Sequence, residues 1–350
     1  MSGRPPLPFA SRVLVWDAAL NATREVLRGQ GMAEVVTPVR LQAVAVEPFI
    51  EPLAAPPGVL ATSPELPMKR LLCRGAPSIF QIAPCFRAAE HGALHREEFH
   101  MIEWYRVASD TDALRRDVEA VVAAVHDAVA GVLDEPAIVP PQQWLEVGVV
   151  DLMSQTLGLS LRGDEDAPRL AAALAPVSAR LGHPLATLRD DRLASSPRAH
   201  SLAAWTAFFS AWCDTCLDPW LDQRRQLGVH VGQMPAPLAA LSEVGPAEDG
   251  SDRALAHRFE SYAHGRELAN GYRELRDPNE QLRRFQDVNT LRASMDQPPL
   301  PIDPEFLADL RSPGLPPCAG VALGLDRLVL LATGRTRLGD IAIELGAPPR

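Results

Sequence analysis

The sequence of 350 residues lacks the features that mark secreted, membrane-spanning or nucleic-acid-binding chains. Its first ten residues, MSGRPPLPFA, contain no apolar segment of the kind found in signal peptides. Charged residues interrupt each apolar stretch well before membrane-spanning length. No run rich in lysine and arginine occurs, and the net charge is −10, whereas proteins that grip nucleic acid usually present a basic face. We therefore expect no membrane association and no tRNA partner.

Cysteine is scarce as well. The five cysteines are scattered and odd in number, which favours free thiols in a reducing cytoplasm over a disulfide framework. Cys213 and Cys216 have the spacing of a metal-ligand pair, but a structural zinc site takes four ligands and the sequence offers no evident second pair. Apolar residues make up 47% of the chain, which permits a sizeable core and argues against global disorder.

The first informative zone, residues 11–110, opens with a helical pattern. Apolar residues recur near a 3.6-residue period from Val13 to Leu27, and Gly29 and Gly31 end the helix. A short β-prone run then stops at Pro38.

Two strands around a polar loop follow, at 78–87 and 99–105. Within the second strand, alternation places Phe99, Met101, Glu103 and Tyr105 on one face. The long loop between the strands suggests a hairpin with a function, although an ordinary surface hairpin gives the same pattern.

A later segment, FESYAHGRELANGYREL at 259–275, carries three glutamates seven residues apart: Glu260, Glu267 and Glu274. Gly265 and Gly271 argue against one helix because each costs about 1 kcal/mol relative to alanine. We predict two strands that turn near Gly265. The alternative is a solvated acidic face.

The two-strand interpretation has a consequence for register. Asn270, Tyr272 and Glu274 then share one face, while Glu267 is out of phase and needs a bulge, which we expect near Gly271.

The segment GVALGLDRLVLLATG at 320–334 reads as a strand followed by a helix. Small residues, Gly320, Ala322 and Gly324, let a ligand or another backbone approach closely, and Arg327 falls in the first helical turn. Tight packing of a helix on a sheet is the alternative explanation.

Together these segments resemble the three signature motifs of the class II aminoacyl-tRNA synthetases. The unit that ends at Pro38 resembles motif 1, Phe86-Arg87 with His95-x-x-x-Phe99 resembles motif 2, and Gly320 to Arg327 resembles motif 3. The order of motifs 2 and 3, with Glu260 and Glu267 between them, makes the joint resemblance specific.

The resemblance is closer to the lysyl branch, through TSPELPMKRLL at 62–72, FHMIEWYR at 99–106 and RELANGYREL at 266–275. It is closest to the elongation factor P lysine ligase family, which PPCAGVALGLDRL at 316–328 resembles in keeping Ala322. Residues 11–110 and 230–335 carry the resemblance.

The resemblance implies an α+β fold, the class II synthetase catalytic fold, with an antiparallel sheet flanked by helices. It implies one catalytic domain over residues 1–350, with a divergent Ala/Pro-rich region at about 135–235. Motif 1 begins near residue 12, so we expect no anticodon-binding domain, and motif 1 implies a homodimer.

The resemblance also implies residues that bind ATP and Mg²⁺. Arg87 would clamp the α-phosphate and the substrate carboxylate, and Arg327 would hold the γ-phosphate; these two are the candidate catalytic residues. Glu260 and Glu267 would bind Mg²⁺, which prefers carboxylate oxygens. The expected ATP site also includes Phe99, whose ring would stack on adenine, and His95 and Glu90 from the loop.

Family motif 2 usually has Glu at the position of Ala89 here. Glu90 can take its place only if the loop adjusts.

For the amino acid, the resemblance implies an acidic pocket that holds two ammonium groups. Its expected members are Glu65, Glu103, Tyr105, Asn270, Tyr272, Glu274 and Ala322. Ala322 would narrow the space near the α-carbon, which in the resembling family goes with β-lysine over α-lysine.

The expected activity is activation of lysine or β-lysine with ATP and transfer to a lysine side chain of elongation factor P. The alternatives are a ligase for another protein or small-molecule acceptor, a non-catalytic paralogue that binds an amino acid or nucleotide, and a tRNA synthetase fragment. The missing domain and the acidic charge disfavour the last.

Overall fold

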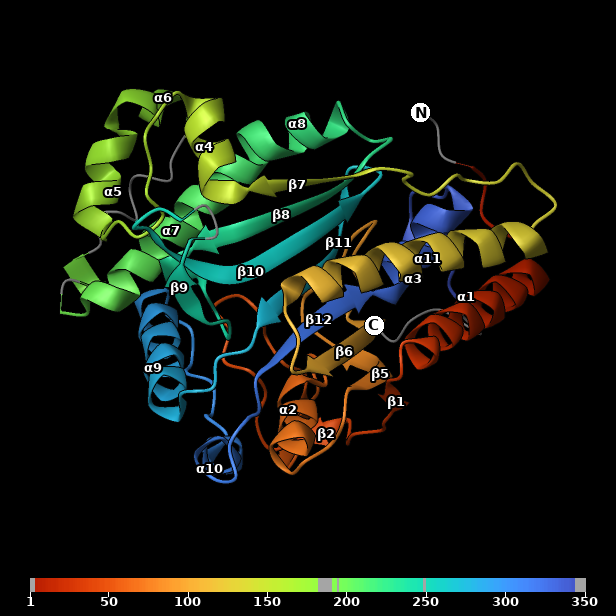
Figure 1. Ribbon diagram of the computed structural model, residues 1–350, viewed down its shortest axis with the longest axis horizontal. Helices are drawn as coiled ribbons and strands as arrows, with labels where there is room; N and C mark the ends of the chain where they lie inside the picture. The colour runs from red at the N-terminus through yellow and green to blue at the C-terminus, as the bar shows by residue number, and fades with distance from the viewer. Residues whose placement is uncertain (1–3, 182–190, 194, 248–249, 344–350) are drawn as a thin grey trace.

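The computed structural model describes residues 4–181, 191–193, 195–247 and 250–343. At its centre lies a largely antiparallel sheet with strand order β1-β5-β6-β12-β11-β10-β8-β7, and β9 pairs with β10 (Figure 1). The edge pairs β1–β5 and β7–β8 are parallel. The strands of this sheet are β1 (Ala33–Glu34), β5 (Ile79–Phe86), β6 (Glu98–Val107), β7 (Trp144–Gly148), β8 (Gly228–Pro235), β9 (Val244–Pro246), β10 (Ala254–Ala263), β11 (Arg266–Arg273) and β12 (Cys318–Gly324).

A small second sheet and a set of helices surround this centre. The small sheet comprises β2 (Arg40–Leu41), β3 (Ala54–Ala55) and β4 (Gly58–Leu60). The helices are α1 (Phe9–Gly29), α2 (Glu65–Cys73), α3 (Thr111–Val132), α4 (Val149–Leu157), α5 (Ala167–Leu174), α6 (Ser178–Leu181), α7 (Pro197–Trp212), α8 (Asp218–Asp222), α9 (Pro278–Ser294), α10 (Pro304–Arg311) and α11 (Leu325–Thr333). The α+β architecture predicted from the sequence is confirmed.

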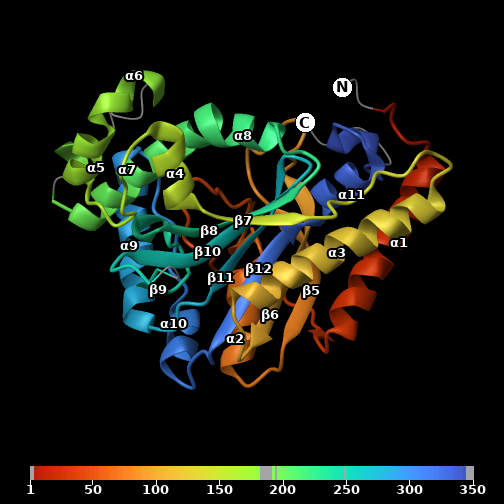
Figure 2. The same cartoon turned by 45° about the horizontal axis from the view of Figure 1, so that its top comes forward.

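The hairpin of β5 and β6 shows why one face of the sheet is apolar and the other is polar. Phe80, Ile102 and Trp104 are fully buried in the core that also takes in α1, α3 and α11. Alternation turns their neighbours to the opposite face, where Gln81 pairs in register with Glu103. Helices α1 and α3 lie side by side along the apolar face (Figure 2).

The two strands predicted within 259–275 are present as β10 and β11, and they turn at His264 and Gly265. The predicted bulge exists but its expected place was wrong. The register shifts where Ser261 pairs with Ala269 and Tyr262 pairs with Glu267, so the extra residue is Leu268 and not a neighbour of Gly271. Both Leu268 and Ala269 are buried in the apolar core. Their burial explains the bulge, because two successive apolar residues must face the core before Asn270 can face outward.

The described residues between 135 and 235 build a second core at one end of the sheet. Strands β7 and β8 extend the sheet there, and α4 to α8 surround an apolar cluster that includes the fully buried Trp205, Phe208 and Trp212. Figure 1 shows these helices grouped at the end of the sheet away from α1. Within the part of the chain that the structure describes, no helix is both long and apolar enough to cross a membrane.

A buried carboxylate fastens α3 to the sheet. Asp117 on α3 accepts a hydrogen bond from Nε1 of Trp104 at 3.1 Å. It also pairs bidentately with Arg106, with distances of 2.5 Å from Nε and 2.6 Å from Nη2. The side chain of Asp117 is 2% exposed, so these donors replace the water that it loses on folding.

Replacing Asp117 with alanine is expected to lower the free energy of unfolding by about 3–5 kcal/mol, because the guanidinium of Arg106 loses its partner in a largely buried place. Urea unfolding measures the change. Asp127→Ala, at an exposed position on the same helix, is the matched control and should change stability little. Equal losses in the two variants would contradict the anchoring role of Asp117.

Candidate active site

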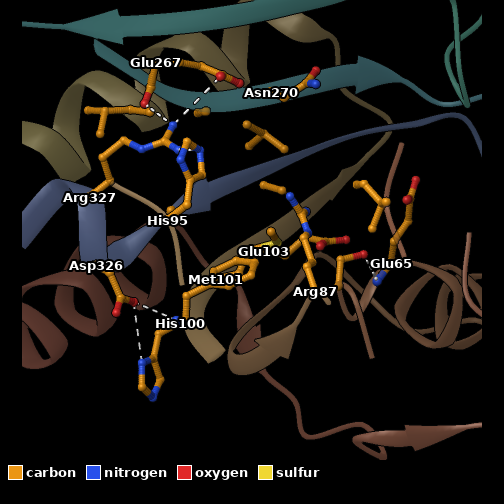
Figure 3. A pocket seen from close by; sticks show the side chains of 18 of the residues that line it. Glu65, Arg87, His95, His100, Met101, Glu103, Glu267, Asn270, Asp326 and Arg327 are labelled. Atoms are coloured by element: carbon orange, nitrogen blue, oxygen red, sulfur yellow. Dashed lines mark hydrogen bonds and ion pairs between the residues drawn. The ribbon is translucent and has the colours of Figure 1, made fainter. Parts of the chain in front are cut away.

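A pocket of about 280 Å³ opens on the polar face of the sheet. Strands β6, β11 and β12, the starts of α2 and α11 and the loop between β5 and β6 supply most of its walls. All but one of the residues predicted for ATP, metal and amino-acid binding line it, namely Glu65, Arg87, Glu90, His95, Phe99, Glu103, Tyr105, Glu267, Asn270, Tyr272, Glu274, Ala322 and Arg327. Figure 3 shows Arg327, His95 and Glu267 at one end and Glu65 at the other, with Arg87 between them.

The exception is Glu260, which does not line the pocket. It is 6% exposed and pairs in register with Asn270. Its Oε1 accepts from Nη2 of Arg258 at 2.8 Å, and its Oε2 accepts from the hydroxyl of Tyr262 at 2.8 Å. The carboxylate of Glu260 is therefore satisfied by the protein itself, on the strand next to β11 and outside the lining of the cavity.

One end of the pocket gathers a cation, an imidazole and a carboxylate. Arg327 donates from Nη1 to the backbone oxygen of Glu267 at 2.6 Å, and its Nη1 lies 3.8 Å from the carboxylate of Glu267. Its Nη2 lies 3.3 Å from Nε2 of His95 (Figure 3). The bulge at Leu268 makes this cluster possible, because it turns Glu267 toward Arg327.

Arg87 projects from the end of β5 into the middle of the pocket. Its Nε donates to the backbone oxygen of Thr62 at 3.3 Å, and its guanidinium lies 5.1 Å from the centre of the Phe99 ring. It also forms a 3.7 Å ion pair with Glu90. A guanidinium with such loose partners is well suited to clamping an incoming oxyanion in two-point fashion.

The loop after β5 brings Glu90, and not Ala89, into the lining of the pocket. Ala89 takes up the left-handed backbone conformation, with φ at 60°, which few non-glycine residues adopt. Its N–H donates to Oε1 of Glu97 at 3.0 Å, and the N–H of Ala88 donates to the backbone oxygen of Glu51 at 2.8 Å. With Ala89 exposed, Glu90 turns into the pocket beside Arg87.

The other end of the pocket buries three carboxylates, and Glu65, Glu103 and Glu274 are 9%, 2% and 1% exposed. The hydroxyl of Tyr105 donates to Oε1 of Glu103 at 2.5 Å. Among the described residues, Oε2 of Glu103 has no hydrogen-bond partner. Burial raises the pKa of Glu103 to about 8, and the charge of Glu65 adds to this effect. Burial likewise raises the pKa of Glu274 to about 7. Such a group of carboxylates is incomplete without further cations.

One of those cations belongs to the protein, which corrects the expectation that substrate ammonium groups alone meet the glutamates. Nζ of Lys69 lies 2.7 Å from Glu65 and 2.5 Å from Glu274. The sequence analysis assigned no role to Lys69. A signal was present, since Lys69 follows Glu65 by four residues on a helix whose neighbouring positions Leu66 and Leu72 are apolar.

Arg258 is a second residue that the sequence analysis missed. From β10 it donates to Oδ1 of Asn270 at 3.2 Å, to the backbone oxygen of Leu238 at 3.0 Å and to Glu260. Its guanidinium also lies 5.8 Å from the centre of the Tyr272 ring. Arg258 thus joins residues expected to bind metal with residues expected to bind the amino acid. No sequence pattern pointed to it, because its partners come together only when β10 and β11 pair.

The small residues of β12 form the floor of the pocket. A Cβ at Gly320 would lie 2.3 Å from the Tyr105 ring and 2.6 Å from Oε1 of Glu274, so this position tolerates only glycine. Ala322 pairs in register with Glu103 on one side and Asn270 on the other. At Gly320 the close neighbours are side chains, and the predicted close approach of a ligand stays a prediction.

Glu103→Gln is expected to stabilise the protein without substrate, and to do so more at pH 8 than at pH 5. The pKa of about 8 in the folded chain exceeds the ordinary value of 4.5, so folding holds a proton that the unfolded chain releases. This contribution weakens the fold progressively as pH rises from about 4.5 to 8, and an amide removes it.

Urea unfolding at the two pH values measures this difference. Glu98→Gln, at an exposed position of the same strand, is the control. A gain of stability that is the same at pH 5 and pH 8 would show that Glu103 is ionised in the folded protein.

Comparison with known proteins agrees with this geometry. Residues 10–343 match the family described as tRNA synthetases class II (D, K and N). The elongation factor P–(R)-β-lysine ligase of Pectobacterium carotovorum is 33% identical over 347 residues, covering 96% of this chain and 95% of its own. A protein of the same name from Vibrio vulnificus is 36% identical over 283 residues, covering 81% and 76%. The chain therefore belongs to the class II tRNA synthetase family and, within it, to the family of the elongation factor P–(R)-β-lysine ligases.

Proposed function

We propose that this protein activates a diamino acid, β-lysine or lysine, with ATP and transfers it to a lysine side chain of elongation factor P. The observation that carries the proposal is the division of one pocket into a cationic end and a carboxylate end. Arg87 stands between the Arg327 cluster and the buried glutamates. An activating enzyme needs this arrangement, because the carboxylate of its substrate must meet a phosphate while its ammonium groups are held away from the phosphates.

The first step forms a bond between a carboxylate oxygen of the amino acid and the α-phosphorus of ATP. The bond between the α- and β-phosphates breaks, and pyrophosphate leaves. Negative charge gathers on the phosphate oxygens in the transition state, and preorganised cations stabilise it. Arg87 is in place to bind the α-phosphate and the attacking carboxylate, and Arg327 to bind the far end of the triphosphate. Phe99 offers its ring to the adenine, with His95 and Glu90 beside it.

The residues present fit a magnesium ion that is shared with phosphates. Within the described ranges there is no cluster of three or more histidine, cysteine, aspartate or glutamate side chains that would hold a metal alone. Mg²⁺ in nucleotide sites needs only one or two carboxylates beside the phosphate oxygens. Glu267 lines the pocket next to Arg327 and would supply one of them, with Glu260 on the neighbouring strand β10. When bound, the ion would neutralise phosphate charge.

The acidic end supports a substrate with two ammonium groups. Glu65, Glu103 and Glu274 supply the carboxylates, and Tyr105, Asn270 and Tyr272 supply further hydrogen-bonding groups around them. Ala322 lies between the strands of Glu103 and Asn270, where its methyl group narrows the space near the α-carbon. This placement supports β-lysine over α-lysine.

In the second step, an amine of the acceptor attacks the activated acyl carbon, forms an amide and releases AMP. The names of the relatives support elongation factor P as the acceptor. The net charge of −10 supports a protein acceptor over tRNA. We propose that residues 1–350 act as one catalytic domain, and free cysteines such as Cys73 and Cys85 support a cytoplasmic setting.

Exchange of labelled pyrophosphate into ATP tests the first step. With Mg²⁺ present, exchange is expected with β-lysine, more slowly with α-lysine, and not with mono-ammonium amino acids. Arg87→Ala should reduce the rate by at least about a hundredfold, because it removes a cation from the transition state. Arg116→Ala, at an exposed position of α3 that does not line the pocket, is the matched control for a lost arginine. Faster exchange with α-lysine than with β-lysine would overturn the role given to Ala322.

Labelled β-lysine tests the second step. Transfer to elongation factor P is expected, with loss of transfer when the acceptor lysine is replaced. Exchange without transfer would favour a ligase for another acceptor, and absence of exchange with every amino acid would favour a non-catalytic paralogue that binds its ligands.

We further propose that the chain works as a homodimer through α1. This helix carries large apolar side chains on its outer face, where Phe9, Val13 and Leu14 are 49%, 43% and 53% exposed, and Val36 nearby in sequence is 91% exposed. Exposed apolar groups gathered on one surface mark an interface. Sedimentation of the purified chain is expected to show a dimer, and Leu14→Asp is expected to yield a monomer. A monomer in the unsubstituted protein at micromolar concentration would rule the interface out.

A further inference from the structure

Lys69 is a buried cation within the carboxylate end of the pocket, yet it does not line the cavity. Its side chain projects from α2 between Leu66, Met68 and Leu72, all of them buried. With 1% exposure, it is among the largest side chains that are fully enclosed.

Three groups surround its ammonium. Nζ lies 2.7 Å from Oε1 of Glu65 and 2.5 Å from Oε2 of Glu274, so it bridges α2 to the residue that follows β11. The ammonium also lies 5.9 Å from the centre of the Tyr272 ring. Although burial alone favours a neutral amine, Glu274 and Glu65 raise the pKa of Lys69 above its ordinary value. Lys69 is therefore a permanent cation at neutral pH.

The charges at this end of the pocket can be counted from these contacts. Glu65, Glu103 and Glu274 contribute three negative charges when ionised, and Lys69 contributes one positive charge. Within this set of four groups, two negative charges are then left, and Oε2 of Glu103 has no partner among the described residues. Glu47 also lines the pocket, where it interacts electrostatically with the guanidinium groups of Arg87 and Arg258. A ligand with two ammonium groups balances this remainder, whereas a ligand with one leaves a buried carboxylate unpaired or protonated.

We propose that Lys69 is a positioning residue whose ammonium group holds Glu65 and Glu274 in place. Because the protein supplies this one cation, the pocket selects a substrate that carries two ammonium groups. This inference rests on the proposed function. It adds that Lys69 determines how many positive charges the selected substrate carries. Lys69 acts through the glutamates and touches neither ATP nor the amino acid.

Removal of Lys69 has a definite physical consequence. A buried carboxylate without its cation either takes up a proton or moves toward water, and both changes spoil the binding geometry. In Lys69→Met, the apolar side chain fills nearly the same volume, so packing is kept while the charge is lost. Glu274 then keeps a proton to higher pH than in the unsubstituted chain, because the charge of Lys69 no longer lowers its pKa.

Calorimetric titration with β-lysine, lysine and norleucine tests the proposal without requiring catalysis. Lys69→Met is expected to weaken binding of the diamino acids by at least about tenfold, as for the loss of a charged hydrogen bond, and to shrink their preference over norleucine. Binding of ATP should change less than about twofold, since the cationic end is untouched. Arg74→Met, at an exposed position at the end of the same helix, is the matched control.

Two further measurements separate a charge effect from a packing effect. Thermal unfolding of Lys69→Met should lose stability more steeply between pH 6 and pH 9 than the unsubstituted chain, because a carboxyl with a raised pKa weakens the fold as it ionises. In Lys69→Ala, propylammonium should restore binding of the diamino acid, and 1-propanol, which has nearly the same shape without the charge, should not.

Unchanged selectivity for diamino acids in Lys69→Met, parallel pH profiles, or equal rescue by 1-propanol would overturn the role of Lys69. Failure of the proposed function has a different signature. It shows as absence of pyrophosphate exchange in the unsubstituted chain, whereas the calorimetric and unfolding measurements still report on Lys69.

Discussion

Burying three carboxylates against one sheet is the constraint on which the rest of this site depends. An ionised carboxylate in a nearly dry place is costly unless cations and hydrogen-bond donors surround it. The fold meets part of this need with Lys69 and Tyr105 and leaves the remainder to a ligand. The pocket is thus destabilised when it is empty, a common feature of sites that bind strongly and selectively.

The same constraint separates the two ends of the cavity. In the proposed function, arginines would serve the phosphate end, where charge develops during the reaction, and a lysine would serve the carboxylate end, where charge is static. A planar guanidinium binds oxyanions in two-point fashion, while a compact ammonium can be enclosed between two carboxylates. Arg258 stands at the junction, because it contacts both Glu260 and Asn270. A lysine in place of the arginines would lose the two-point binding of oxyanions. An arginine in place of Lys69 would be too large to be enclosed between the two carboxylates.

Much of this arrangement could be predicted from the sequence, and the parts that could not have physical reasons. Alternation in the second strand predicted that Phe99, Met101, Glu103 and Tyr105 share one face, and all four line the pocket. A bulge was predicted because Glu267 does not alternate with Asn270, Tyr272 and Glu274, but its position in the strand was predicted wrongly. Its position depends on how Leu268 and Ala269 pack in the core, and that packing involves strands distant in sequence. Lys69 and Arg258 were missed for the same reason, because their partners meet only in three dimensions. Glu260 pairs with Arg258 and Tyr262 outside the lining of the pocket, and its role in metal binding stays a prediction.

The floor of the pocket also limits how this protein can diverge. Gly320 has no room for a side chain, because the Tyr105 ring and Glu274 occupy the space that a Cβ would need. Gly324 lies at the end of the strand, where α11 begins. Ala322 lines the pocket between the strands of Glu103 and Asn270 and already carries a methyl group there. If the proposed amino-acid site is adapted to a new substrate through β12, residue 322 is thus a more accessible position for change than residue 320.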